Sequence, residues 1–137
     1  MRKEIQIHNR IDELQQVAAF TEGIAEELGL GFELTMNLNL VLEEMVSNVI
    51  FYAYPEGTDA TIGLLASLDG QSLTFELSDH GRPFDPTACA EANVDINPAE
   101  RQIGGMGIYI TKQIMDEVSY RRENNQNILT MRKTIKQ

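Results

Sequence analysis

The spacing of apolar residues changes along this chain of 137 residues, and this change constrains the fold more than any other feature. Residues 9–29 and 31–54 repeat apolar side chains at intervals of three and four, which is typical of amphipathic helices. Residues 61–68 and 72–79 instead follow the pattern of strands with a buried face. A chain of this length that contains both patterns is expected to form one domain in which helices cover a sheet.

The remaining patterns complete the expected order of elements. Residues 3–8, 118–124 and 127–133 are predicted to be strands, and residues 106–117 a third helix. The order is then strand, helix, helix, strand, strand, long loop, helix, strand, strand, and its two hairpins mean that the sheet cannot be all parallel. We therefore expect an α+β fold: a two-layer α/β sandwich with a mixed sheet covered on one face by helices, in a single domain over 1–137.

Two helix ends and one long loop can also be predicted. Asn9 is the expected N-cap of the first helix and Gly29 lies near its end, while Pro55 stops the second helix. From His80 to Gly105 the chain is rich in Gly, Pro, Asp and Asn and has little periodicity. Long segments of this kind inside a compact domain are usually lids or binding loops.

Charge and cysteine content restrict the classes of partner. The formal net charge is −10, whereas a nucleic-acid binder normally presents a basic surface, so direct binding of DNA or RNA is not expected. Two interpretations of the acidity stay open, namely solubility and attraction of a basic protein partner. Cys89 is the only cysteine, which rules out an intramolecular disulfide. There is neither a signal-peptide pattern nor an apolar run long enough to span a membrane, so we expect a cytoplasmic protein without membrane contact.

Two polar motifs could each form part of a ligand site. Glu44 and Asn48 lie one turn apart on the second helix, away from its apolar face, although the simpler interpretation is a solvated surface. Asp79 ends a strand, where a carboxylate can accept hydrogen bonds from an exocyclic amine. Gly81 follows, and a glycine lets a flat ring approach the backbone. The simpler interpretation here is a strand-ending turn.

A third motif is a cluster of glycines at the start of the third helix. Gly104, Gly105 and Gly107 precede or open this helix, whose first N–H groups are unpaired and carry partial positive charge. Such a segment can hold a phosphate group, but it matches neither a Walker A motif nor a dinucleotide-binding fingerprint. A loop end followed by an ordinary helix start remains the alternative.

The three motifs together are more specific than any one of them. Glu-x-x-x-Asn on a helix, Asp-x-Gly at a strand end and Gly-x-Gly at a helix start resemble, in this order, the N, G1 and G2 boxes of the GHKL ATPases, which share the Bergerat fold. The segment "DHGRPFDP", residues 79–86, is similar to the form of the G1 box found in the anti-sigma-factor serine kinase branch. The segment that starts "GGMGIYITKQIMDE" resembles the C-terminal half of that branch, so the likeness covers most of the chain and is weak only in residues 1–30.

This resemblance implies a site for ATP and Mg²⁺. Asn48 would be the protein ligand of the metal, and Glu44 would be the general base that takes a proton from a serine hydroxyl of a partner protein. Asp79 would accept a hydrogen bond from the adenine amino group, and Gly81 would give the ring room. Thr130 would join Asp79 through a water molecule.

The resemblance also assigns the phosphate side of the site. Gly105 and Gly107 would hold the phosphates, residues 85–104 would be the ATP lid, and Arg101 is a lid cation that could reach the γ-phosphate. Glu43 points about 100° round the helix from Glu44 and is expected on the surface.

The implied function is that of an anti-sigma regulatory factor in transcription control. It would bind Mg-ATP, phosphorylate a serine of an anti-sigma antagonist and sequester a sigma factor. The alternative is an ATP-dependent protein-binding module that sequesters a sigma factor or another partner with little or no kinase activity. Pro83 replaces a glycine of the sensor histidine kinases, and no separate phosphoacceptor helix is present, so a sensor kinase is disfavoured. The family also pairs often through the sheet and first helix, so a homodimer is a further expectation.

Overall fold

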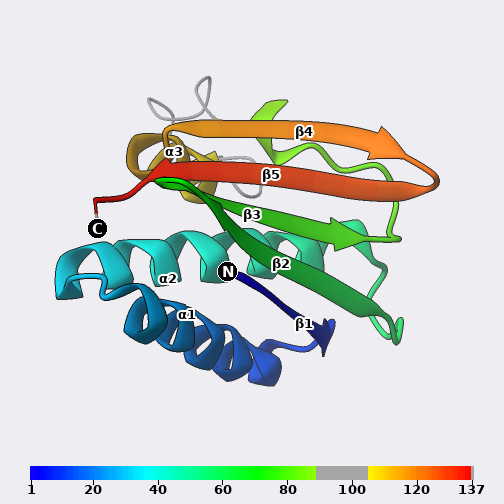
Figure 1. Ribbon diagram of the computed structural model, residues 1–137. Coiled ribbons are helices and arrows are strands. Elements are labelled where there is room, and N and C mark those ends of the chain that lie inside the picture. The colour runs from blue at the N-terminus through cyan, green and yellow to red at the C-terminus, as the bar shows by residue number, and fades with distance from the viewer. Residues whose placement is uncertain (89–104, 137) are drawn as a thin grey trace.

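Figure 1 presents the protein as a computed structural model, which describes residues 1–88 and 105–136. The predicted order of elements is confirmed. The elements are β1 (Arg2–His8), α1 (Leu14–Leu28), α2 (Phe32–Asn48), β2 (Thr61–Asp69), β3 (Ser72–Asp79), α3 (Gly105–Ile114), β4 (Glu117–Glu123) and β5 (Gln126–Thr134). Among the described residues no helix is both long and apolar enough to cross a membrane.

The five strands form one sheet in the order β1-β2-β3-β5-β4, and each neighbouring pair is antiparallel. The α+β sandwich is confirmed, but the expectation of a mixed sheet is wrong. Two helices separate β1 from β2, and a chain that passes through two antiparallel helices returns in the opposite direction. The single helix α3 does make β4 parallel to β3, but β5 lies between them and is antiparallel to both.

The core lies between the sheet and the helices, which cover one face of it (Figure 1). Alternate residues of β3 face inward and are buried, namely Leu73, Phe75, Leu77 and Asp79. The middle helix α2 packs against both α1 and α3 and buries the apolar residues Leu38, Val41, Leu42 and Met45. Burying each large apolar side chain contributes about 1.5 to 3 kcal/mol, so α2 is firmly held and is a rigid support for polar groups.

The two ends of the first helix differ in how well they could be predicted. Gly29 ends α1 in the left-handed conformation with φ 68°, as expected for a glycine cap. Asn9 does not cap the helix, because a short 3-10 turn, Ile11–Glu13, precedes α1. Its side chain instead donates to the Thr58 carbonyl and accepts from the Ala60 N–H, which ties the start of the helix to the loop before β2.

Helix α2 continues into one turn of π-helix, Val49–Ala53, before the chain becomes extended at Tyr54. The expected stop before Pro55 is therefore confirmed, but the change of winding could not be predicted. Turns of π-helix are rare and occur often at functional sites. This turn follows Asn48 directly and carries the segment against which the loop after β3 packs.

Candidate nucleotide site

Asp79 is buried at the end of β3 and faces the helices. Its Oδ1 accepts hydrogen bonds from the Gly81 N–H at 2.8 Å and from the Asn127 amide at 2.9 Å. Burial raises the pKa of the Asp79 carboxyl, and the two donated hydrogen bonds oppose this shift in part. An acceptor of this kind, fixed by two donors in a desolvated position, is suited to bind an amine donor.

Gly81 lies in a turn that is attached closely to the π-helical turn. A Cβ at this position would meet the Ala53 carbonyl oxygen at 2.3 Å, so only glycine fits. The Arg82 N–H donates to the same carbonyl at 2.8 Å, and the His80 N–H donates to the Tyr54 hydroxyl. The need for glycine here comes from this close approach, and the expected role of Gly81 in making room for a ring stays a prediction.

Asn127, rather than Thr130, is the residue of β5 that reaches Asp79. The two residues are direct partners across β3 and β5, and both face the core. Thr130 pairs with Glu76 and lies on the opposite face of the sheet, where Arg121 donates to its hydroxyl at 3.5 Å. The expectation that Thr130 joins Asp79 is therefore wrong. Thr130 lies three positions after Asn127, and residues three apart on a strand point to opposite faces.

Asn127 could not be recognised as a site residue from the sequence, because it belongs to the segment "NNQN", residues 124–127, which is typical of a turn. The signal that could have found it is the register of β3 and β5. Side chains alternate with period two, and Asn127 has the same parity as the inward residues Leu129 and Met131. Besides Asp79, its amide also donates to the Arg82 carbonyl, and its oxygen accepts from Phe84 N–H and the Tyr120 hydroxyl.

Glu44 on α2 lies against the first turn of α3. A Cβ on Gly107 would meet the Glu44 Oε2 at 2.8 Å and its Cβ at 3.4 Å. The structure therefore brings these two predicted site residues together, and Gly105 opens the same helix. Free N–H groups at a helix start attract anions, so a carboxylate and an anion-binding helix end are adjacent here.

Asn48 is buried one turn further along α2, and its Nδ2 has no hydrogen-bond partner among the described residues. A buried amide group without a partner costs free energy, so it indicates a position where a ligand completes the bonding. The oxygen and nitrogen of an amide can exchange places by rotation, and the oxygen is the atom suited to Mg²⁺. Asn48 is therefore suitable as a ligand of the Mg²⁺ ion that the resemblance implies. Glu43 lies apart and accepts a hydrogen bond from Asn39.

A small cavity of about 10 Å³ lies beside Asp79. It is lined by Met45, Val49, Leu77, Asp79, Phe84, Pro86, Tyr120, Asn127 and Leu129. The walls are mostly apolar with Asp79 and Asn127 as polar groups, which suits the flat faces and polar edge of a base. The space holds about one water molecule, so an adenine ring requires the walls to move apart.

Phe84 and Pro86 are the wall residues best placed to move, since Phe84 belongs to no regular element and Pro86 only begins a short 3-10 turn. The ring of Phe84 contacts Tyr52 of the π-helical turn with ring centroids 5.9 Å apart. Pro86 lies in the segment predicted as a lid, residues 85–104, and Phe84 directly precedes that segment. Most of that segment, with Arg101 and Gly104, lies outside the described residues, so the expected role of Arg101 stays a prediction.

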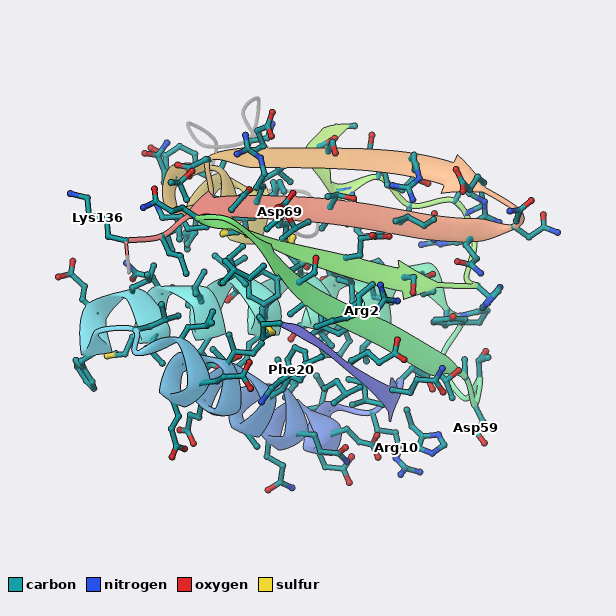
Figure 2. The ribbon with its side chains drawn as sticks, viewed as in Figure 1. Arg2, Arg10, Phe20, Asp59, Asp69 and Lys136 are labelled. Atoms are coloured by element: carbon teal, nitrogen blue, oxygen red, sulfur yellow. The ribbon has the colours of Figure 1, made fainter. Side chains whose placement is uncertain are left out.

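A larger cavity of about 730 Å³ lies at the end of the molecule where Figure 2 labels Arg10 and Asp59. Ile50, Phe51 and Tyr54 also line it, whereas Glu44, Asn48 and Asp79 do not. Tyr54 connects the two regions, because its hydroxyl accepts the His80 N–H beside Asp79. Burial of this phenol raises its pKa. Of the predicted site residues that the structure describes, Asp79 therefore lines the smaller cavity, and Glu44, Gly105 and Gly107 lie at the start of α3.

Comparisons with known proteins show the family to which the chain belongs. The family model described as histidine kinase-like ATPase domain matches residues 7–133. A serine-protein kinase RsbW of Halalkalibacterium halodurans is 29% identical over 115 residues, which cover 81% of this chain and 69% of that protein. The serine/threonine-protein kinase BtrW of Bordetella bronchiseptica is 26% identical over 98 residues, which cover 72% and 69%.

Two solved structures share the fold. The RsbU and RsbW domains of a Mycobacterium tuberculosis protein superpose with a TM-score of 0.70 at 14% identity, covering 98% of this chain and 32% of that one. A SiaB-SiaC complex from Pseudomonas aeruginosa gives a TM-score of 0.60 at 13% identity, with 96% and 89% covered. At these identities the likeness establishes the fold alone.

Proposed function

The chain belongs to the family of histidine kinase-like ATPase domains, and from this premise we propose that it binds Mg-ATP and transfers the γ-phosphoryl group to a serine of a partner protein. The similarity to serine-protein kinases supports a protein substrate. The observation that carries the proposal is the close approach of Glu44 to Gly107, where a Cβ would meet the Glu44 Oε2 at 2.8 Å, with Asn48 one turn away. A base, a metal ligand and a phosphate-binding helix end then converge at one place.

The base of the nucleotide would bind beside Asp79. The carboxylate would accept a hydrogen bond from the exocyclic amine, and the apolar side chains of Met45, Val49 and Leu129 would pack on the ring. Because Asn127 and the Gly81 N–H hold the carboxylate in place, little ordering of the acceptor is needed on binding. Outward movement of Phe84 and Pro86 would provide the space.

The phosphates would lie between the start of α3 and the Glu44–Asn48 face of α2. Asn48 would hold Mg²⁺. The metal would neutralise part of the phosphate charge, so that the phosphates can lie near the Glu44 carboxylate. Glu44 would accept the proton of the serine hydroxyl while the serine oxygen forms the new bond to the γ-phosphorus. The bond from that phosphorus to the β–γ bridging oxygen breaks, and ADP leaves.

The partner is proposed to be an anti-sigma antagonist, with sequestration of a sigma factor as the regulatory consequence, inside the cytoplasm. The test is incubation of the pure protein with Mg-ATP labelled at the γ-phosphate and a candidate antagonist, followed by identification of the labelled residue. Label on a serine of the antagonist is the expected result. Retained ATP binding without any label would favour the alternative of a binding module with little or no transfer.

Replacement of Glu44 separates binding from transfer. Glu44→Gln is expected to keep the ATP affinity within about threefold and to lower the rate of transfer by roughly 10²- to 10⁴-fold, the usual contribution of a general base. Glu43→Gln, compared at a saturating concentration of the partner, is the matched control, because Glu43 precedes Glu44 on the same helix and bonds to Asn39 instead. Equal rates for the Glu44 and Glu43 variants would contradict the assignment of Glu44 as base.

A further inference from the structure

The outer side of α2 exposes three large apolar side chains in a row. Phe32, Met36 and Leu40 follow one another at four-residue spacing and expose 80%, 56% and 39% of their surface. Residues with this spacing lie on one side of a helix, one turn apart. We call these three residues the α2 ridge. Large apolar side chains gathered on one exposed surface are typical of a site where another protein binds.

The α2 ridge leads directly to Glu44. This residue is the next position in the same spacing, four residues beyond Leu40 and therefore about 6 Å further along the helix axis. Gly107 of α3 lies so close to its carboxylate that a Cβ there would meet the Oε2 at 2.8 Å. A protein that covers the α2 ridge would bring a neighbouring segment of its own surface to the carboxylate and to the start of α3.

The charges around the α2 ridge indicate what kind of surface would cover it. Between Arg10 and Arg82 the chain contains neither lysine nor arginine. Helices α1 and α2 therefore carry acidic charges alone, at Glu22, Glu26, Glu27, Glu33, Glu43 and Glu44. Lys133 lies with Glu33 along a groove of about 400 Å³ on the α3 side and pairs with Asp116 at 3.7 Å.

An apolar strip with an acidic border favours a partner with basic residues around an apolar patch, and it repels an acidic one. A second copy of this chain would present the same acidic helices, so the charge disfavours self-association at this surface. We propose that the α2 ridge is the docking surface for the phosphoacceptor protein, which binds through an apolar patch bordered by lysine and arginine and thereby places its serine at Glu44. The position of the serine rests on the proposed function, whereas the docking surface can be tested without phosphoryl transfer.

The test uses the full chain and two fluorescein-labelled helical peptides with the same pattern of leucines. One peptide has lysines beside the leucines and the other has glutamates. The double variant Phe32→Ser/Met36→Ser removes the two most exposed residues of the α2 ridge, and Ile11→Ser is a matched control at an apolar residue that is 46% exposed before α1. Fluorescence anisotropy then gives the dissociation constants.

The lysine peptide is expected to bind the wild type and Ile11→Ser alike and the ridge variant at least tenfold more weakly. The variant Glu33→Gln/Glu43→Gln should weaken binding about threefold to tenfold, and the glutamate peptide should not bind. Equal affinity of the lysine peptide for wild type and ridge variant would show that general negative charge attracts it and would overturn the proposal. Equal binding of the two peptides would overturn the proposal that the partner has lysine and arginine around its apolar patch.

Nucleotide titration of the same variants separates this proposal from the proposed function. A fluorescent ATP analogue with Mg²⁺ should bind the ridge variant and the wild type equally, since the α2 ridge lies outside the site. If the wild type binds no nucleotide, the proposed function fails, while the peptide result still decides the docking surface. With an antagonist that the wild type labels, the ridge variant should raise KM at unchanged kcat, and an unchanged KM would contradict docking of this substrate.

Discussion

Among single residues, Asp79 combines a structural and a proposed binding role in one carboxylate. Its carboxylate accepts a hydrogen bond from the Gly81 N–H, which holds the turn after β3. A second hydrogen bond, from the Asn127 amide, fixes the carboxylate itself. Burial raises its pKa, so the charged form is less favourable in the folded protein than in the unfolded chain. The contribution of this group to stability is therefore most favourable below the ordinary pKa of aspartate and is lost as the pH rises through the folded pKa.

Asp79→Asn tests both roles at once. The asparagine oxygen can still accept the two hydrogen bonds, so the variant should fold and should be at least as stable as the wild type at pH 7. This relative gain should disappear as the pH falls below the ordinary pKa of aspartate, which thermal unfolding at several pH values can follow. Affinity for ATP should fall roughly 10- to 100-fold, because a hydrogen bond to a charged acceptor is lost.

A matched control for the affinity change is Glu76→Gln, an exposed-face carboxylate on the same strand that pairs with Arg121. It should leave ATP affinity unchanged. An Asp79→Asn protein that binds ATP as tightly as the wild type would contradict the proposed place of the adenine amine.

The sequence indicated Glu44, Asp79 and Gly107 as candidate site residues, because each belongs to a short motif whose spacing can be seen in the chain itself. The partner of Asp79 could not be found in this way, because it depends on how β3 and β5 are aligned. A shift of one residue turns every side chain of a strand to the other face. Thr130 and Asn127 differ by three positions, and only the register shows that Asn127 faces Asp79.

Among the elements, the π-helical turn after α2 has the largest influence on the site. It brings the Tyr52 and Ala53 carbonyls to Arg82, whose side chain and backbone N–H donate to them. The turn after β3 is thereby attached to the helix that carries Asn48. The sequence predicted the length of this helix but not its winding, since the same apolar residues suit both an α-helical and a π-helical turn.

Gly81→Ala is expected to disrupt this attachment. The new methyl group would meet the Ala53 carbonyl oxygen at 2.3 Å, and a backbone atom cannot move aside without cost. We expect a loss of about 2 to 3 kcal/mol in the free energy of unfolding, measured by urea denaturation, as for an overpacked core. Gly23→Ala is a control of opposite sign, because Gly23 lies inside α1, where a Cβ would make only an ordinary contact with the Lys3 Nζ at 3.9 Å, and alanine favours a helix by about 1 kcal/mol.

If Gly81→Ala unfolds at the same urea concentration as the wild type, the two segments are not packed as closely as described. A folded variant that has lost ATP affinity would instead show that the attachment positions Asp79 more than it stabilises the fold.

In the whole molecule, lysine and arginine are distributed unevenly over the elements, although Lys112 lies on α3 and Lys3 of β1 pairs with Glu27 of α1 at 3.3 Å. The helices α1 and α2 contain acidic residues without lysine or arginine, whereas Arg121 and Arg132 pair with carboxylates on the open face of the sheet. The net charge could be counted from the sequence, but its distribution could not be located until the elements were placed in layers. The acidity therefore has a place in the fold, next to the α2 ridge and Glu44, as well as a general effect on solubility.

This distribution predicts how salt affects stability. Carboxylates on α1 repel one another, and Glu22 and Glu26 are four residues apart on the same helix, where like charges destabilise. Added NaCl screens this repulsion, since the Debye length falls from about 30 Å at 0.01 M to about 10 Å at 0.1 M. It also weakens exposed ion pairs such as Arg132–Glu117, but such pairs contribute at most about 1 kcal/mol each and often nothing measurable. Repulsion should therefore dominate.

The melting temperature is expected to rise by roughly 2 to 4 °C between 0.01 M and 0.3 M NaCl, which corresponds to about 1 kcal/mol for a domain of this size. Glu22→Gln/Glu26→Gln should raise the melting temperature at low salt and reduce its increase with salt, because two of the repelling charges are gone. Replacing Glu76 and Glu123 instead, which pair with Arg121 on the sheet, should lower the melting temperature slightly at low salt. A melting temperature that falls with salt in the wild type would mean that the ion pairs of the sheet outweigh the acidic helices, and the charge argument for a basic partner at the α2 ridge would then be weakened.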